Sequence, residues 1–288
     1  MYETDPNYAK VMEHKGLLPP YYADATVDTV KKMPVFYEPG ARWHYGQNQE
    51  WLTLVIQNVS GLSLEAYEQK FIFTPLGITD MTYQPRQEDK VGMSFSHNPK
   101  VGPNGAPIFM QTFPWAEDGS KRLGYDSKGC EFPPNHQWGG SGLFGSPASY
   151  LKILRALLRG GLAPDGTTRI LKQETVDLMF EPHIRSDTQR EDLYVFAGWR
   201  GDPFSKKRGS AFPGTDWGYG GLLGGEGFPS GRGKGTLSWS GFANTYWVVD
   251  REKDVAFVCW TQVIPAGEEA LFDAWEVLET ELYKQVGK

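Results

Sequence analysis

Apolar residues return every three or four positions in several stretches of the chain, a spacing typical of helices that bury one face. Helices are predicted at residues 8–15, 49–59, 63–73, 147–159, 173–180 and 268–285. Polar N-cap residues precede three of these helices, and glycines end two of them. These boundary residues are Asn48, Ser63, Ser146, Gly61 and Gly160.

Short runs bounded by Gly, Asn or Asp dominate the C-terminal third, as is typical of strands. Strands are predicted at residues 193–199, 218–223, 235–239, 244–249 and 255–261, and residues 250–254 join the last two as a hairpin. The helix at 268–285 has one apolar face that we expect to lie on this sheet. That face consists of Leu271, Trp275, Leu278 and Leu282.

Residues 88–137 are rich in Pro and Gly and have no clear period, so we expect long loops with one hairpin. The whole pattern indicates an α/β protein of the α+β type, with an antiparallel sheet flanked by helices. Two regions are expected. Residues 1–190 form a mainly helical and loop region, and residues 191–288 form the sheet with its terminal helix.

Composition narrows the classes of partner. The 288 residues carry 29 Lys+Arg and 35 Asp+Glu without a long basic run, so neither nucleic acid nor a membrane is an expected partner. No apolar span reaches membrane length, the N-terminus lacks a signal-peptide pattern, and only two cysteines occur, which fits a cytoplasmic protein. The five histidines lack the spacing of metal ligands, and we expect no metal or other cofactor.

Residues 39–48 form a turn, a short run with one tyrosine, and the start of a helix. Tyr45 therefore stands just before a helix N-terminus, where backbone N–H groups and the helix dipole favour negative charge. A phenol placed there is suited to act as a base. On spacing alone, the favoured interpretation is that Tyr45 is a half-buried aromatic residue with a satisfied hydroxyl.

Two further stretches have glycines where a substrate-binding site would need them. Residues 138–146 contain four glycines, which implies a close approach between backbone segments. Trp239-Ser240-Gly241 ends a predicted strand, and Gly241 would let that strand approach a substrate closely.

Residues 39–82, which end in Phe73-Thr74-Pro75-Leu76-Gly77-Ile78-Thr79-Asp80-Met81-Thr82, resemble the class C branch of the serine β-lactamase and penicillin-binding superfamily. The Gly-rich turn at 138–146 extends the resemblance, which is greatest to the esterases of that branch and to fungal acyltransferases of lovastatin biosynthesis. The resemblance implies one β-lactamase-like catalytic domain.

The resemblance also implies roles for individual residues. Tyr45, in Tyr45-Gly46-Gln47, would be the general base, although Gln47 replaces the usual Asn of that motif. Trp239, Ser240 and Gly241 would match the third motif of the family, and the N–H of Phe242 would help to form the oxyanion hole. Trp239 in place of Lys argues against carboxylate-bearing β-lactams as the preferred substrate.

The nucleophile of the family is the serine of a Ser-x-x-Lys motif that precedes the tyrosine, and no such motif occurs before Tyr45. The one match is Ser149-Tyr150-Leu151-Lys152. The helical pattern places Lys152 opposite the apolar stripe, where it would stay solvated and cationic, so we do not assign this pair as the nucleophile. We expect instead that this chain lacks the N-terminal part of the family's domain.

The resulting hypothesis is a serine hydrolase or acyltransferase that acts on small-molecule carboxylic esters or thioesters through an acyl-enzyme. A second copy of the chain, in a homodimer, is a candidate partner. The alternative is a nucleophile-less relative that only binds ligands; carbohydrate binding has only the ten tryptophans in its favour. The enzyme hypothesis predicts that Tyr45, Trp239 and Gly241 meet in one cleft and that Ser149 lies outside it.

Overall fold

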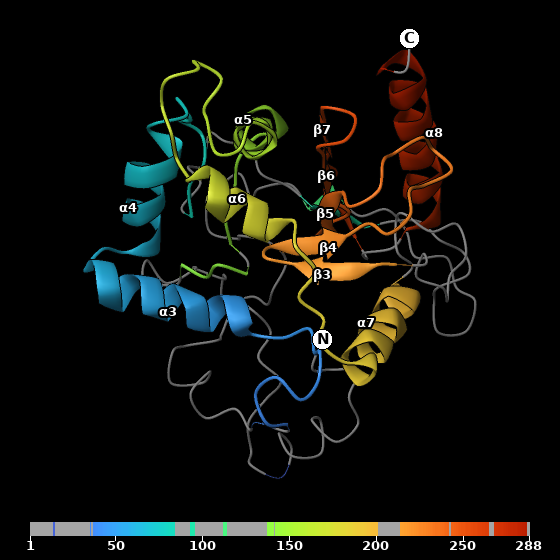
Figure 1. Cartoon of the computed structure of the whole chain (residues 1–288). Helices are drawn as coiled ribbons and strands as arrows, with labels where there is room; N and C mark the ends of the chain where they lie inside the picture. The colour runs from blue at the N-terminus through green and yellow to red at the C-terminus, as the bar shows by residue number, and fades with distance from the viewer. Residues whose placement is uncertain are drawn as a thin grey trace.

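A five-stranded antiparallel sheet organises the C-terminal third of the molecule (Figure 1). Its strand order is β3-β4-β5-β6-β7, so each strand pairs with its neighbour in sequence. The strands are β3 (Asp216–Gly218), β4 (Gly221–Leu223), β5 (Leu237–Ser240), β6 (Tyr246–Asp250) and β7 (Val255–Cys259). This computed structural model describes residues 14, 35, 37–83, 93–95, 112–113, 137–140, 142–200, 214–241, 243–264 and 268–286.

Two helices cover opposite faces of this sheet. The ring of Trp275 in α8 (Glu269–Val286) lies 5.0 Å from the ring of Tyr246. On α5 (Pro147–Leu158), the ring of Tyr150 lies 6.4 Å from that of Trp247. Because consecutive strand residues point to opposite faces, Tyr246 and Trp247 assign α8 and α5 to the two sides. Figure 1 shows the two helices on either side of β5 to β7.

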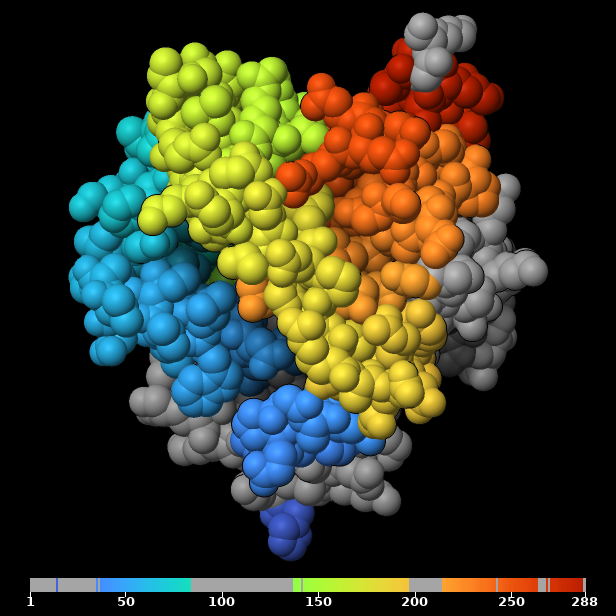
Figure 2. Space-filling model, in the orientation of Figure 1, coloured from blue at the N-terminus to red at the C-terminus, as the bar shows by residue number. Residues whose placement is uncertain are grey.

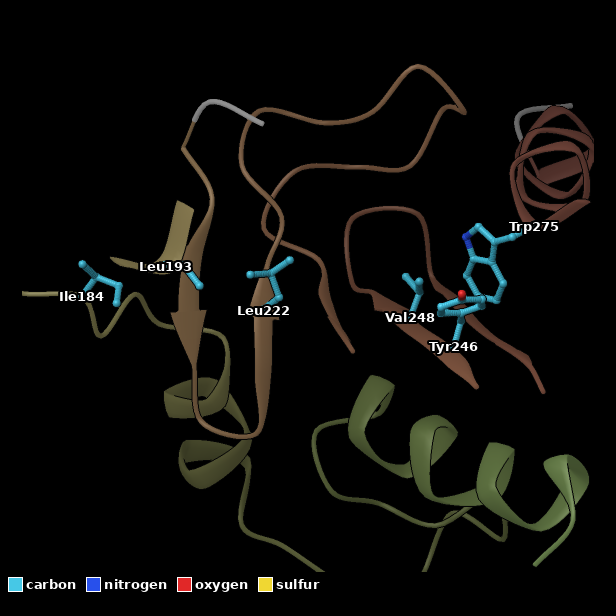
Figure 3. Close-up of a cluster of buried hydrophobic side chains, with 6 residues drawn as sticks. All are labelled: Ile184, Leu193, Leu222, Tyr246, Val248 and Trp275. Carbon is cyan, nitrogen blue, oxygen red and sulfur yellow. The ribbon is translucent and has the colours of Figure 1, made fainter. Parts of the chain in front are cut away.

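The buried core has two centres. One joins the sheet to residues 184–193 on one hand and to α8 on the other, and Figure 3 shows Trp275 beside Tyr246 and Val248. Its buried members are Ile184, Leu193, Leu222, Tyr246, Val248 and Trp275. The other joins α5 to the segment after α4, through Phe73, Leu76, Ile78, Met81, Ala156 and Ala163.

Three consecutive elements precede the second core: α3 (Asn48–Ser60), α4 (Leu64–Glu68) and a π-helical turn, η2 (Gln69–Phe73). As predicted, Ser63 caps α4 by accepting the N–H of Ala66 at 3.2 Å. Gly61 ends α3 in the left-handed conformation, with φ of 71°. Ser146 caps α5, and Gly160 follows it with φ of 62°. The helix expected at 8–15 lies outside the described residues apart from His14.

A second, smaller sheet has the order β2-β1-β8. The antiparallel pair β1 (Met93–Phe95) and β2 (Thr112–Phe113) falls in the stretch where one hairpin was expected. β8 (Val263–Ile264) pairs with β1 in parallel. The rest of residues 88–136 lies outside the described part of the chain.

The strand predicted at 193–199 is wrong, because these residues belong to helix α7 (Asp187–Arg200). The start signal was present: Ser186 accepts the backbone N–H of Gln189 at 3.3 Å, and Gln189 Oε1 accepts the N–H of Arg185 at 2.7 Å. This is a variant of the capping box. Local capping thus outweighs the β-branched and aromatic side chains that suggested a strand.

Three other sequence predictions need correction. The single strand at 218–223 is a hairpin, since β3 and β4 turn at Gly220 with φ of 100°. Asn48 is the first residue of α3, and Gln47 occupies the N-cap. Leu278 is 52% exposed, because α8 turns Trp275, Glu279 and Tyr283 toward the sheet instead. The remaining helix at 173–180 is confirmed as α6 (Gln173–Met179).

Candidate active site

Five aromatic rings gather where the segment before α3 meets the sheet. We call these residues the aromatic cluster: Trp43, Tyr45, Phe196, Trp217 and Trp239. The ring of Tyr45 is stacked on that of Phe196 at 4.9 Å and lies 5.7 Å from that of Trp239. Trp217 meets Trp239 edge-on at 4.8 Å. The structure therefore brings together Tyr45 and Trp239, as the motif order predicted.

Tyr45 comes two residues before the N-cap of α3. The first turn of that helix is closed by the N–H of Trp51, which donates to the carbonyl of Gln47 at 3.2 Å. Glu50, in the same turn, is buried, and burial raises the pKa of its carboxyl group. The backbone of Tyr45 thus lies just before the N-terminus of α3, while its ring packs on Phe196 and Trp239.

Trp239 lies one residue before the point where β5 extends past β4. The β4–β5 pairing covers Leu222 with Ser238 and Leu223 with Leu237 and goes no further. On the other side, β6 pairs with the whole of β5, and Ser240 lies opposite Tyr246. In this register Gly221, the first residue of β4, comes opposite Trp239, and β4 has no residue opposite Ser240.

A tight turn follows β5. The N–H of Gly241 donates to the carbonyl of Thr245 at 2.8 Å, and the N–H of Asn244 donates to the carbonyl of Gly241 at 3.2 Å. A Cβ atom on Gly241 would lie only 2.3 Å from Thr245 Oγ1, so the Thr245 hydroxyl leaves no room for a side chain at position 241. Phe242, whose N–H was expected in the oxyanion hole, lies outside the described residues.

Sequence reasoning missed Asn244, which holds this turn in place. It is fully buried and has φ of 54°, in the left-handed region that Asn tolerates better than most residues. Its Nδ2 donates to the carbonyl of Val263 at 2.7 Å, and its Oδ1 accepts the hydroxyl of Tyr246 at 2.8 Å. An asparagine three residues after a strand-ending glycine was the available signal.

The Gly-rich turn makes the close approach that its composition predicted. The N–H of Gly139 donates to Thr53 Oγ1 at 2.8 Å, and a Cβ atom there would lie 3.1 Å from the carbonyl oxygen of Gln49. At Gly140, a Cβ atom would lie 2.4 Å from Glu50 Oε1. The turn is therefore packed directly on the first turns of α3, the helix that Tyr45 precedes.

Ser149 and Lys152 make other contacts. Ser149 is buried in the first turn of α5 and hydrogen-bonds with Asp80. Burial acts to raise the pKa of Asp80, but hydrogen bonds from the hydroxyls of Ser146 and Ser149 hold this pKa below its usual value. Lys152 is half-buried rather than exposed as predicted, because its Nζ donates to the carbonyl of Gly77 at 2.6 Å. The pair thus serves the contact between α5 and residues 77–80.

A small pocket of about 90 Å³ adjoins the aromatic cluster. Trp43 and Trp217 belong to both. Its lining residues are Arg42, Trp43, His183, Ile184, Gln189 and Trp217. Among the described residues, no group of three or more His, Cys, Asp or Glu side chains is placed to hold a metal ion.

Comparison with known proteins identifies the family to which this site belongs. The profile of the family described as "Beta-lactamase" matches residues 3–282. The chain belongs to the β-lactamase family. The fold agrees, since the unliganded simvastatin synthase (LovD) of Aspergillus terreus superposes with a TM-score of 0.68 over 99% of this chain and 62% of that one, at 25% identity.

Two curated relatives show which kinds of protein this chain resembles in sequence. Monacolin J acid methylbutanoyltransferase of Aspergillus terreus is 29% identical over 88% of this chain and 56% of its own length. Lovastatin esterase of Penicillium rubens is 29% identical over 90% of this chain and 60% of its own length. The resemblance to fungal acyltransferases and esterases is thus confirmed, and the chain spans a little over half the length of these relatives.

Within the described residues, no helix has both the length and the apolar character that a membrane span requires.

Proposed function

We propose that this protein takes part in acyl transfer from small-molecule esters or thioesters, either to water or to an alcohol, with Tyr45 as general base. The observation that carries the proposal is the meeting of Tyr45 with Trp239 near the end of β5, the strand that extends past β4 at Ser240. The relatives support the reaction class, since one is named as an acyltransferase and the other as an esterase.

The reaction would proceed through an acyl-enzyme. Tyr45 removes the proton of a serine hydroxyl as its oxygen attacks the acyl carbonyl carbon. The backbone N–H of Phe242, directly after Gly241, stabilises the negative oxygen of the tetrahedral intermediate. Tyr45 then returns the proton to the leaving alcohol or thiol. Water or the acceptor alcohol repeats these steps in reverse and releases the acyl group.

The aromatic cluster gives this proposal its substrate preference. Trp239, Trp217 and Phe196 offer ring faces and edges around the phenol of Tyr45, and such walls favour apolar acyl groups. No Lys side chain stands at the position of Trp239 to pair with a substrate carboxylate.

The serine in this scheme is not Ser149, whose hydroxyl is buried and bonded with Asp80. We therefore expect the 288-residue chain by itself to turn over esters slowly or not at all. The burial of the one Ser-x-x-Lys match also favours a second function, ligand binding without catalysis. A fluorophosphonate probe separates the two, because it labels only a protein with an activated serine.

The test is turnover of p-nitrophenyl butyrate by the 288-residue chain and by the protein as encoded, with any sequence upstream of Met1. In whichever form is active, Tyr45→Phe should lower kcat by about 100- to 10,000-fold, the usual contribution of a general base. Tyr37→Phe is the matched control, because it removes a hydroxyl from the same segment at a half-exposed ring.

Full activity of the Tyr45→Phe variant would refute the role of Tyr45. Silence of every form toward both the ester and the fluorophosphonate probe would favour the binding function.

A further inference from the structure

Side chains of helix α7 (Asp187–Arg200) bind the segment that carries Tyr45. Two nitrogens of the Arg42 guanidinium bind the carboxylate of Asp192: Nε donates to Oδ2 at 2.7 Å, and Nη2 donates to Oδ1. The same Oδ2 accepts the backbone N–H of Trp43 at 3.2 Å. Hydrogen bonds and charge from Asp192 raise the pKa of Arg42, so the guanidinium stays charged. A guanidinium and a carboxylate joined by two parallel hydrogen bonds, here called the fork, have both their separation and their relative orientation fixed.

Two more contacts come from the same face of α7. Gln189 Nε2 donates to the carbonyl of Gly40 at 2.5 Å, and the ring of Phe196 is stacked on that of Tyr45. Residues 189, 192 and 196 are spaced by three and four, so they lie along one side of the helix. Figure 2 shows the segment before α3, in blue, against α7, in yellow. One helical face thus contacts residues 40, 42, 43 and 45.

The helix is itself fixed to the sheet that carries Trp239. Leu193 of α7 is fully buried in the core beside the sheet. Arg190 Nη1 donates to Asp216 Oδ2 at 2.9 Å, at the start of β3. The other oxygen of Asp216 accepts the backbone N–H groups of His183, Ile184 and Trp217. α7 is therefore a rigid link between the segment of Tyr45 and the strands that carry Trp217 and Trp239.

From these contacts we infer that Asp192 and Phe196 are positioning residues that set the phenol of Tyr45 against Trp239. Residues 42–45 have no regular secondary structure, so side-chain contacts such as these hold them. Asp192 acts through Arg42 and the N–H of Trp43, while Phe196 acts on the ring of Tyr45 directly. The inference rests on the proposed function only for its effect on catalysis, since the position of the ring is measurable without turnover.

The first experiment places 3-fluorotyrosine at position 45 of the protein as encoded and records its ¹⁹F resonance. Stacking on Phe196 shifts this resonance by ring current. Asp192→Asn, which weakens the fork, should move it toward the value of the unfolded protein. Glu191→Gln is the matched control, because it removes a carboxylate one residue away that acts on Arg42 only through its charge. The control should leave the resonance within its linewidth.

The second experiment compares steady-state kinetics in the active form. Misplacing a catalytic group by about 1 Å costs up to about 100-fold in rate. Asp192→Asn and Phe196→Leu should therefore lower kcat by about 10- to 100-fold with less than about threefold change in KM. Glu191→Gln should stay within twofold. Asp192→Glu, which keeps the charge and the fork, should recover part of the rate.

The outcomes separate the two ideas. An unmoved ¹⁹F resonance in Asp192→Asn overturns the inference, even if Tyr45→Phe abolishes turnover. If the resonance moves but kcat does not change, Asp192 does position the ring, and Tyr45 is not the general base. If Asp192→Asn fails to fold by circular dichroism, Arg42→Lys replaces it, because Lys keeps the charge and loses the fork. The same shift is then expected, and its absence is equally decisive.

Discussion

Replacing Gly241 by alanine should destabilise the protein only while Thr245 is present. The Cβ atom of the new alanine would lie 2.3 Å from Thr245 Oγ1, far inside contact distance, but 3.6 Å from Thr245 Cβ, an ordinary contact. The φ of Gly241 is not in the left-handed region, so the backbone itself accepts alanine. The whole cost therefore comes from one oxygen atom, and Thr245→Ala removes it.

The magnitude follows from these contacts. Overpacking of this kind typically costs about 1–3 kcal/mol. In the Thr245→Ala background, Gly241→Ala should instead stabilise by about 0.4–1 kcal/mol, because alanine restricts the unfolded chain more than glycine does. The effect of one substitution thus changes sign with the other. The turn keeps its hydrogen bond in all variants, since the N–H of residue 241 donates to a backbone carbonyl.

The assay is denaturation by guanidinium chloride, followed by tryptophan fluorescence, for wild type, both single variants and the double variant. Gly235→Ala is a contrasting control: its φ of 67° strains alanine, but nothing lies within 4 Å of its Cβ position. It should destabilise equally in both backgrounds. If Gly241→Ala also cost the same in both, the contact with Thr245 would not be the reason for glycine, and the reasoning would fail.

Two further predictions concern carboxylates away from the site. Glu279→Gln should lower the free energy of unfolding by about 3 kcal/mol, because it leaves the buried guanidinium of Arg232 without its charged partner at 2.9 Å; Glu281→Gln, which breaks an exposed pair on the same helix, should cost less than about 0.5 kcal/mol in the same denaturation assay. Burial raises the pKa of Glu68 from 4.5 to about 7, against the hydrogen bond from Tyr83, so folding favours its protonated form. Stability should therefore fall as pH rises from about 4.5 to 7, and Glu68→Gln should remove this fall and be more stable than wild type at pH 8 by on the order of 2 kcal/mol; an identical pH dependence in both proteins would contradict the assignment.

Local signals predicted most of the elements correctly. Ser63, Ser146, Gly61 and Gly160 mark helix ends because a cap is a hydrogen bond or a backbone conformation within a few residues of the chain. The hairpin at 250–254 is equally local, and Asp250 Oδ1 accepts the N–H of Lys253 at 3.0 Å within it.

The secondary-structure prediction failed where two local signals competed. The prediction of the buried helix face failed where distant partners decided which side chains are buried. Residues 193–199 have β-branched and aromatic side chains, yet the capping residues seven positions earlier start a helix that runs through them. In α8, Leu278 is exposed while Glu279 is buried, because Arg232, Ser230 and Trp275 all bond with its carboxylate. Those partners lie outside any local window except Trp275.

The sequence by itself determined the family, the order of its motifs and the tyrosine before a helix, since each of these depends on residues close together in the chain. Only the tertiary structure decided that Tyr45 meets Trp239, that Ser149 turns to Asp80, and that α7 holds the segment of Tyr45 through Asp192. Arg42 and Asp192 are 150 residues apart, and nothing in either stretch specifies the other. Such a pair forms because the two elements pack on the same sheet, and packing is a property of the whole chain.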